Sequence, residues 1–259
     1  MQIDLNCDMG ESFGNYTLGC DDQVIQYITS ANVACGFHAS DPQVMERTVA
    51  LAKRHGVGLG AHPGYPDLRG FGRRALDCTP AEVRADVLYQ VGALAALARV
   101  QGVSLQHVKP HGGLYNTAAG HEPTARAICQ ALAEYDLELI LVVLAGPGGK
   151  VIRTVAAEFG LRVALEAFAD RAYTPEGRLV PRGQEGAVIH DPGLVAERCL
   201  RMAQEGVVEA IDGSLVELRP HTICVHGDTP SAVELVQGVR SRLEAAGVEL
   251  VPLGRMSWD

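Results

Sequence analysis

The chain has 259 residues, of which 47% are hydrophobic and 20% are charged, and its formal net charge is −9. This length is close to the roughly 250 residues of one α/β barrel domain, and the composition is typical of a globular protein. A nucleic-acid-binding surface would be basic, so the acidic excess argues against that class of partner. It does not exclude an anionic substrate, because the field inside a cleft can oppose the sign of the net charge.

Seven cysteines are scattered along the chain without a C-x-x-C pair, which supports neither a zinc finger nor a disulfide framework. Buried, reduced thiols in a reducing cytosol are the expected state. The first residues, MQIDLNCDMGE, lack the basic and apolar regions of a signal peptide, and the apolar run at 137–145 is too short to span a bilayer. We therefore expect a cytoplasmic protein without a membrane partner.

Short apolar segments alternate with longer helical stretches along the whole chain. Two helices carry clear start signals: Asp41 or Ser40 precedes Pro42, and Thr79 is followed three positions later by Glu82. Strands are predicted at 3–7, 31–35, 56–61, 105–108, 139–144, 162–167, 222–225 and 248–251, and helices at 21–29, 42–54, 80–101, 122–135, 150–159, 192–205 and 231–246.

This alternation is typical of parallel βαβ units, and seven or eight units favour a closed (β/α) barrel, distorted or seven-stranded, over an open doubly wound sheet. Two segments break the alternation. Residues 174–192 contain three glycines and three prolines and are expected to run over the barrel mouth, and 207–218 alternate around Asp212-Gly213, which predicts a hairpin. Since no linker or repeat divides the chain, residues 1–259 are expected to form a single domain.

Chemistry in α/β folds lies at the carboxyl ends of strands, and several of these ends carry polar residues in glycine-rich loops. The clearest is HVKPHGGLYN at 107–116, where Lys109 and His111 flank a proline directly after a strand. Lysine supplies positive charge for a carboxylate or phosphate, and histidine supplies acid–base chemistry near neutral pH. A lysine that ends an apolar strand argues against a merely solvated side chain, so this is the preferred site.

The first strand places Asn6 and Asp8 on one face, and Glu11 follows in the loop, although capping of that loop is an alternative role for such side chains. His38 and His62 each follow a strand. Together with Asp8 they make the two-histidine, one-carboxylate set of many catalytic metal sites. Hydrogen bonding of these histidines to a substrate, without a metal, is equally compatible with the sequence.

Two loops suit anions. Arg73 and Arg74 lie in a glycine-rich loop that suits a carboxylate or phosphate, although ordinary ion pairs on a solvent-exposed loop are the alternative. The GPGGK loop at 146–150 has the composition of a phosphate cradle but is not a Walker A motif, and such turns are common without a ligand.

The sixth and seventh strand ends add further polar residues: Glu166, Asp170, Arg171, His226 and Asp228.

Seven motifs resemble the LamB/YcsF family and keep the family's order from the first strand to the last. They are DLNCDMGESFG (4–14), ANVACGFHASDP (31–42), GAHPGYPD (60–67), GFGRR (70–74), VKPHGGLYN (108–116), EAFADRAY (166–173) and CVHGDTP (224–230). The resemblance implies a barrel related to the glycoside hydrolase and deacetylase barrels, acting as the A subunit of a bacterial ATP-dependent 5-oxoprolinase with partner subunits B and C. The implied reaction opens the 5-oxoproline lactam to L-glutamate as ATP is hydrolysed to ADP and phosphate.

The implied chemistry gives the motif residues expected roles. ATP, with Mg²⁺, would phosphorylate the amide oxygen while cationic side chains gather charge, and an acid or histidine would then activate water or move the ring nitrogen's proton. We expect Asp8, Lys109 and His111 to be catalytic, and the contacts to substrate or ATP to come from Asn6, Glu11, His38, His62, Arg73, Arg74 and Asn116. Two other interpretations remain: a metal-dependent amidohydrolase or deacetylase that acts alone, with Asp8, His38 and His62 as ligands, and a substrate-binding subunit without chemistry of its own.

Overall fold

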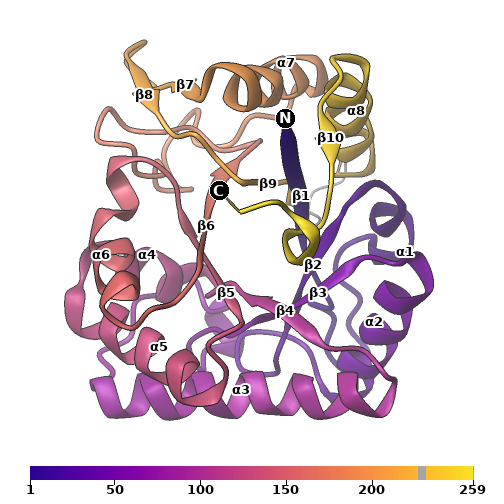
Figure 1. Ribbon diagram of the computed structural model, residues 1–259, viewed down its shortest axis with the longest axis vertical. Coiled ribbons are helices and arrows are strands. Elements are labelled where there is room, and N and C mark those ends of the chain that lie inside the picture. Colours follow the sequence, from indigo (N-terminus) through magenta and orange to yellow (C-terminus); the bar gives the residue numbers. More distant parts are fainter. Residues whose placement is uncertain (227–231, 259) are drawn as a thin grey trace.

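The computed structural model describes residues 1–226 and 232–258, and within them seven parallel strands close a barrel that helices surround (Figure 1). The strands occur in the order β1-β2-β3-β4-β5-β6-β9, and β9 pairs with both β6 and β1, which closes the sheet. Their bounds are β1 (Gln2–Met9), β2 (Ser30–Ala34), β3 (Gly58–His62), β4 (Leu105–Val108), β5 (Ile140–Leu144), β6 (Val163–Phe168) and β9 (Thr222–Cys224). The predicted seven-stranded (β/α) barrel is confirmed.

The helices cover the outside of the barrel, and most lie where the sequence predicts them. Asp41 caps α2 by accepting hydrogen bonds from two backbone N–H groups, and Thr79 and Glu82 form the expected capping box of α3. The helices are α1 (Asp21–Val24), α2 (Pro42–His55), α3 (Pro80–Val100), α4 (Gly112–Gly120), α5 (Glu122–Tyr135), α6 (Lys150–Glu158), α7 (Pro192–Glu205) and α8 (Ala232–Ala245). Four short 3₁₀ turns accompany them in the described ranges: η1 (Ile25–Tyr27), η2 (Leu68–Gly70), η3 (Pro147–Gly149) and η4 (Leu253–Arg255).

Several features outside the barrel strands also follow from the sequence. The predicted hairpin is present as the antiparallel pair β7 (Val207–Glu209) and β8 (Leu215–Glu217). The seven cysteines, all of which the structure describes, are free thiols. Among the helices of residues 1–226 and 232–258, none has both the length and the apolar character needed to cross a membrane.

Two elements differ from the prediction. The sequence does not predict helix α4, because it begins with two glycines, which are poor helix formers. A tertiary contact fixes its start instead: the N–H of Gly113 donates to the Gly72 carbonyl at 2.7 Å. The last predicted strand is the short β10 (Glu249–Leu250), which pairs with the beginning of β1 and lies outside the closed circuit.

The C-terminal segment covers the amino-terminal end of the barrel. Leu253 and Met256 pack against Ile140 and Val142 in a small apolar cluster. The N–H of Gly254 also donates to the side chain of Gln106 on β4. Because this end is covered, the carboxyl end of the strands is left for a ligand.

Polar side chains fill much of the barrel interior. The Asp4 carboxylate accepts hydrogen bonds from Thr29 (2.7 Å), Ser30 (2.5 Å) and Thr222 (2.5 Å). One layer closer to the mouth, the amide of Asn6 donates to Thr222 and to Glu166 on β6. Buried polar groups are costly unless each finds a partner, so this network fixes which residues of the first strand point inward.

Asp4 is expected to make stability depend on pH. Burial raises its pKa from 3.8 to about 6, although three hydrogen bonds favour the ionised form. A carboxyl with a raised folded-state pKa stabilises the fold fully below the unfolded value of 3.8 and loses that contribution as the pH rises through about 6. The total is about 3 kcal/mol.

Urea denaturation of the wild type and Asp4→Asn at pH 4, 5, 6 and 7 tests this expectation. The free energy of unfolding of the wild type should fall more steeply over this range than that of the variant. Burial also raises the pKa of Asp21 to about 6, but this group is present in both proteins and cancels in the comparison. Parallel pH dependences for the two proteins would contradict the assignment to Asp4.

Candidate active site

A cavity of about 440 Å³ opens at the carboxyl end of the barrel. Its lining combines acidic, basic and aromatic side chains from several strand ends, among them Tyr115 and Phe168. The segment predicted to run over the mouth does so, because Arg178, Val180 and Arg182 are among the lining residues. The residues expected from the sequence therefore lie in a cavity to which the 174–192 segment contributes part of the wall.

Lys109 lies at the floor of this cavity between two carboxylates. Its Nζ is 2.8 Å from Asp8 Oδ1 and 2.8 Å from Glu166 Oε1, and the residue is only 2% exposed. Burial by itself would lower the pKa of Lys109, but Asp8, Cys224 and Glu166 raise it well above its usual range. Burial likewise opposes ionisation of Asp8, yet His62 and Lys109 hold the pKa of that carboxyl well below its usual value. The floor thus carries charged groups in a water-poor setting.

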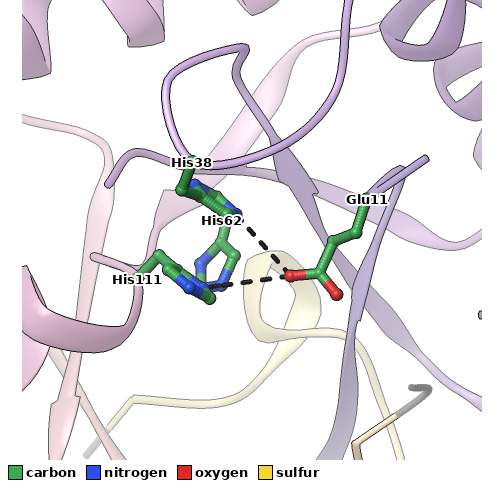
Figure 2. Close-up of side chains that lie close together, drawn as sticks. All are labelled: Glu11, His38, His62 and His111. Atoms are coloured by element: carbon green, nitrogen blue, oxygen red, sulfur yellow. Dashed lines mark hydrogen bonds and ion pairs between the residues drawn. The ribbon is translucent and has the colours of Figure 1, made fainter. Parts of the chain in front are cut away.

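Three histidines and one glutamate converge at one wall of the cavity (Figure 2). The rings of His38 and His111 stack with centroids 3.7 Å apart, and the ring of His62 meets His111 edge-on. Glu11 Oε1 lies 3.6 Å from His38 Nε2 and 3.9 Å from His111 Nδ1. Burial lowers the pKa of both His38 and His111, which favours neutral imidazoles. Four such donors within 4.8 Å of one another could hold a metal ion.

An Asp–His pair lies at another part of the cavity. His226 Nδ1 is 2.8 Å from Asp170 Oδ1, and Asp170 is 1% exposed. Burial would raise the pKa of Asp170, but the neighbouring His226 lowers it. A ring nitrogen of His226 and a carboxylate oxygen of Asp8 lie within 4.8 Å of each other, so both side chains can contact the same part of a bound ligand.

Most of the predicted site residues do line the cavity: Asp8, Glu11, His62, Arg73, Lys109, His111 and Asn116. Three others lie elsewhere. Asn6 is buried in the barrel interior, where its amide donates to Glu166 and Thr222. His38 stacks on His111, which separates it from the cavity lining. Arg74 forms an ion pair with Asp67 and its side chain is 61% exposed, so the ion-pair alternative describes it better than a ligand contact.

The Asp170–His226 pair is absent from the site residues predicted from the sequence, although both positions are polar strand ends. The available signal is their place directly after β6 and β9, where parallel strands deliver side chains to the mouth. Asp228, another polar residue noted at these two ends, lies outside the described residues.

The 146–150 loop is tightly packed rather than shaped as a cradle. Gly148 and Gly149 are buried, and a Cβ on either would collide with a carbonyl oxygen, of Gly177 and Leu144 respectively. Lys150 is exposed to solvent. The glycines are explained by close packing, which is the alternative that the sequence left open.

The start of α4 offers a test of close packing beside the site. A Cβ on Gly113 would lie 2.5 Å from the Arg74 carbonyl oxygen, whereas a Cβ on Gly92 in α3 would meet open space among the described residues. Gly113→Ala is expected to lower the free energy of unfolding by about 1–3 kcal/mol, and Gly92→Ala to raise it by about 0.5–1 kcal/mol. Urea denaturation measures both, and equal effects of the two substitutions would contradict the close approach.

Comparison with known proteins agrees with this architecture. Residues 3–257 match the model of the LamB/YcsF family. Two relatives, each named as the A subunit of 5-oxoprolinase, come from Pyrococcus abyssi and Syntrophobacter fumaroxidans. Both are 56% identical to the chain over 98% of its length and over 98% and 99% of their own. The crystal structure of a lactam utilization protein from Thermus thermophilus superposes with a TM-score of 0.92 at 50% identity, covering 98% of this chain and 100% of that one. The chain belongs to the LamB/YcsF family.

Proposed function

We propose that this chain is the A subunit of an ATP-dependent 5-oxoprolinase and that the lactam ring of 5-oxoproline opens in its cavity to give L-glutamate. Relatives that carry this name share more than half of its residues over nearly the whole chain. The observation that carries the proposal is the ionised Asp8 facing the Asp170–His226 pair, with the nearest atoms within 4.8 Å. Amide hydrolysis needs such positioned acid–base groups.

The cavity suits the two polar parts of 5-oxoproline, a carboxylate and a lactam amide. Arginines at the mouth fit the carboxylate, because a guanidinium group binds it through paired hydrogen bonds. Burial lowers the pKa of Arg171 only to about 10, so this side chain stays charged at neutral pH. The lactam N–H then points to the floor, where Asp8 accepts a hydrogen bond. The cationic lining comprises Arg73, Lys109, Arg171, Arg178 and Arg182.

ATP supplies the activation that an unreactive amide lacks. The γ-phosphoryl group moves to the amide oxygen, releasing ADP, and water adds to the ring carbon. The C–N bond then breaks, its electron pair and a proton go to nitrogen, and γ-glutamyl phosphate forms. A second water attacks the acyl carbon and releases phosphate and glutamate. The mouth arginines hold the phosphoryl oxygens throughout.

His226 moves the protons in this sequence of steps. Its imidazole takes a proton from the attacking water and returns it to the departing ring nitrogen, while Asp170 holds the ring in orientation. Lys109 has a different role from the phosphate contact expected from the sequence. Two carboxylates already bind its ammonium group, so it keeps Asp8 ionised and fixed in place.

Two observations favour a division of labour with partner subunits B and C. The glycine-rich loop at 146–150 is packed against neighbouring backbone, and Lys109 is committed to carboxylates of its own chain. In this proposal the barrel holds the lactam and opens it, and ATP, with Mg²⁺, is bound with the help of the partners.

Labelled substrate tests the phosphoryl activation. When 5-oxoproline carries ¹⁸O in its ring carbonyl, the phosphate released by the reconstituted complex should carry the label, because the amide oxygen becomes a phosphate oxygen. Label that remains wholly in glutamate would contradict the proposal. Glutamate formation by this chain alone, without ATP, would instead show a self-sufficient amidohydrolase.

A further inference from the structure

Four consecutive strand ends bring metal-binding side chains to one point of the barrel mouth. Glu11 follows β1, His38 follows β2, His62 ends β3, and His111 follows β4. One donor atom from each lies within 4.8 Å of all the others, and Figure 2 shows the four side chains turned toward a common centre. The first and last of these residues are 100 positions apart in the sequence, so the barrel fold itself assembles the group.

Backbone carbonyls fix the protonation of two of the rings. His62 Nδ1 is 2.7 Å from the Lys109 carbonyl, and His111 Nε2 is 2.8 Å from the Phe71 carbonyl. A carbonyl oxygen only accepts, so each of these nitrogens carries the ring proton. When both rings are neutral, the remaining nitrogens, His62 Nε2 and His111 Nδ1, present lone pairs to each other across 2.9 Å. Two lone pairs at this distance repel unless a proton or a metal cation lies beside them.

His38 adds a second, independent observation. The residue is 1% exposed, and within the described part of the chain neither of its ring nitrogens has a hydrogen-bond partner. Its Nε2 is directed at Glu11 Oε1, 3.6 Å away. A single proton shared by the other two histidines would relieve their repulsion but would leave His38 unsatisfied, which is costly for a buried imidazole. An ion at the common centre gives each of the three rings a partner for one nitrogen.

We propose that this cluster binds one divalent transition-metal ion through His38, His62, His111 and Glu11. Imidazole nitrogens with one carboxylate suit zinc, iron, cobalt or nickel. Bonds of about 2.1 Å place neighbouring ligand atoms about 3–3.4 Å apart, and the separations of 2.9, 3.6 and 3.9 Å in the structure bracket this range. The hydrogen bonds from His62 and His111 to backbone carbonyls are the outer contacts that orient metal-binding histidines.

This ligand set differs from the one expected from the sequence, which paired Asp8 with His38 and His62. Asp8 does approach His62, with Oδ2 at 3.3 Å from Nε2, but its other oxygen accepts hydrogen bonds from Lys109 and Asn32. Glu11 is the carboxylate directed at His38. Because Glu11, His62 and His111 line the cavity, the ion would face the ligand space and polarise a bound oxygen.

Metal binding is measured directly and so is tested separately from lactam turnover. The full-length chain is stripped with a chelator and titrated with Co²⁺, followed by visible absorption, and then with Zn²⁺ by calorimetry. One Co²⁺ per chain is expected, displaced by one Zn²⁺. His38→Gln and Glu11→Gln should each weaken binding at least about 100-fold, because loss of a ligand exceeds the cost of losing an outer contact. His55→Gln, which changes an exposed histidine, is the matched control and should bind as the wild type does.

Three results would overturn the proposal. One is a wild-type chain that binds neither ion more tightly than about 100 µM. Another is undiminished binding by Glu11→Gln, a variant whose side chain lies near the cavity and whose folding is checked by circular dichroism. The third is loss of binding in Cys224→Ser with retention in Glu11→Gln, which would move the ion to the neighbouring Asp8, Cys224 and His226 group.

Discussion

Lys109→Met is expected to lower the free energy of unfolding by about 3–5 kcal/mol, because it leaves two buried carboxylates without their cation. The ammonium group lies 2.8 Å from both Asp8 and Glu166, and Glu166 is completely buried. The exposed Lys150 offers a matched control, and Lys150→Met should change stability by less than about 0.5 kcal/mol. Urea denaturation at pH 7 measures all three proteins.

A double variant separates the ion pair from the packing of the lysine side chain. Lys109→Met combined with Glu166→Gln leaves only one buried carboxylate without its cation. The double variant should therefore lose at least about 1 kcal/mol less unfolding free energy than the two single variants lose in sum. Strict additivity, or a Lys109→Met protein as stable as the wild type, would contradict the role assigned to this cation.

His226→Gln is expected to lower kcat of the reconstituted complex by about 10²–10⁴-fold, the usual contribution of a general acid–base group. KM for 5-oxoproline should change little, because the arginines proposed to bind its carboxylate are untouched. His190→Gln alters an exposed histidine and should retain wild-type kcat. A His226→Gln complex with normal kcat would show that another group moves the protons.

Asp170→Asn tests the orienting carboxylate behind that histidine. Asp170 contacts the imidazole rather than the cavity centre, so it is a positioning residue. Its loss should lower kcat while leaving KM for 5-oxoproline nearly unchanged, since the imidazole no longer has a carboxylate that holds its orientation. A fall in stability without a fall in kcat would indicate a purely structural role.

The fold was predictable because its signals are local and repeated. Apolar segments, helix caps such as Thr79 with Glu82, and strand-end glycines recur along the chain, and each points to a parallel βαβ unit. The exception is α4, whose first residues are glycines and whose start depends on a contact with the 70–74 loop. A helix whose start depends on a tertiary contact need not carry a start signal in its own sequence.

The site was predictable only to the level of its strand ends. Lys109 and His111 stand out because a lysine and a histidine directly after an apolar strand are unusual. The partners of Lys109 depend on closure of the barrel, which brings Glu166 on β6 across to β1 and β4. The choice between Asp8 and Glu11 beside His38 likewise depends on a turn of the backbone that spacing does not reveal.

The two arginines of the 70–74 loop show the same limit. Arg74 looks equivalent to Arg73 in the sequence, yet only Arg73 lines the cavity, because Asp67 draws Arg74 to the outside. The difference comes from the ion pair between Arg74 and Asp67 in the folded loop, which cannot be predicted from the sequence.

Glutamate formation by a reconstituted complex tests the central claim most directly. This chain, the proposed partner subunits B and C, ATP and 5-oxoproline are mixed, and glutamate and phosphate are measured. The wild-type mixture should form both in equal amounts, the chain alone should form neither, and Asp8→Asn in the full mixture should lower glutamate formation at least about 100-fold. Full glutamate formation with Asp8→Asn would contradict ring opening in this barrel and leave the chain with substrate binding as its role.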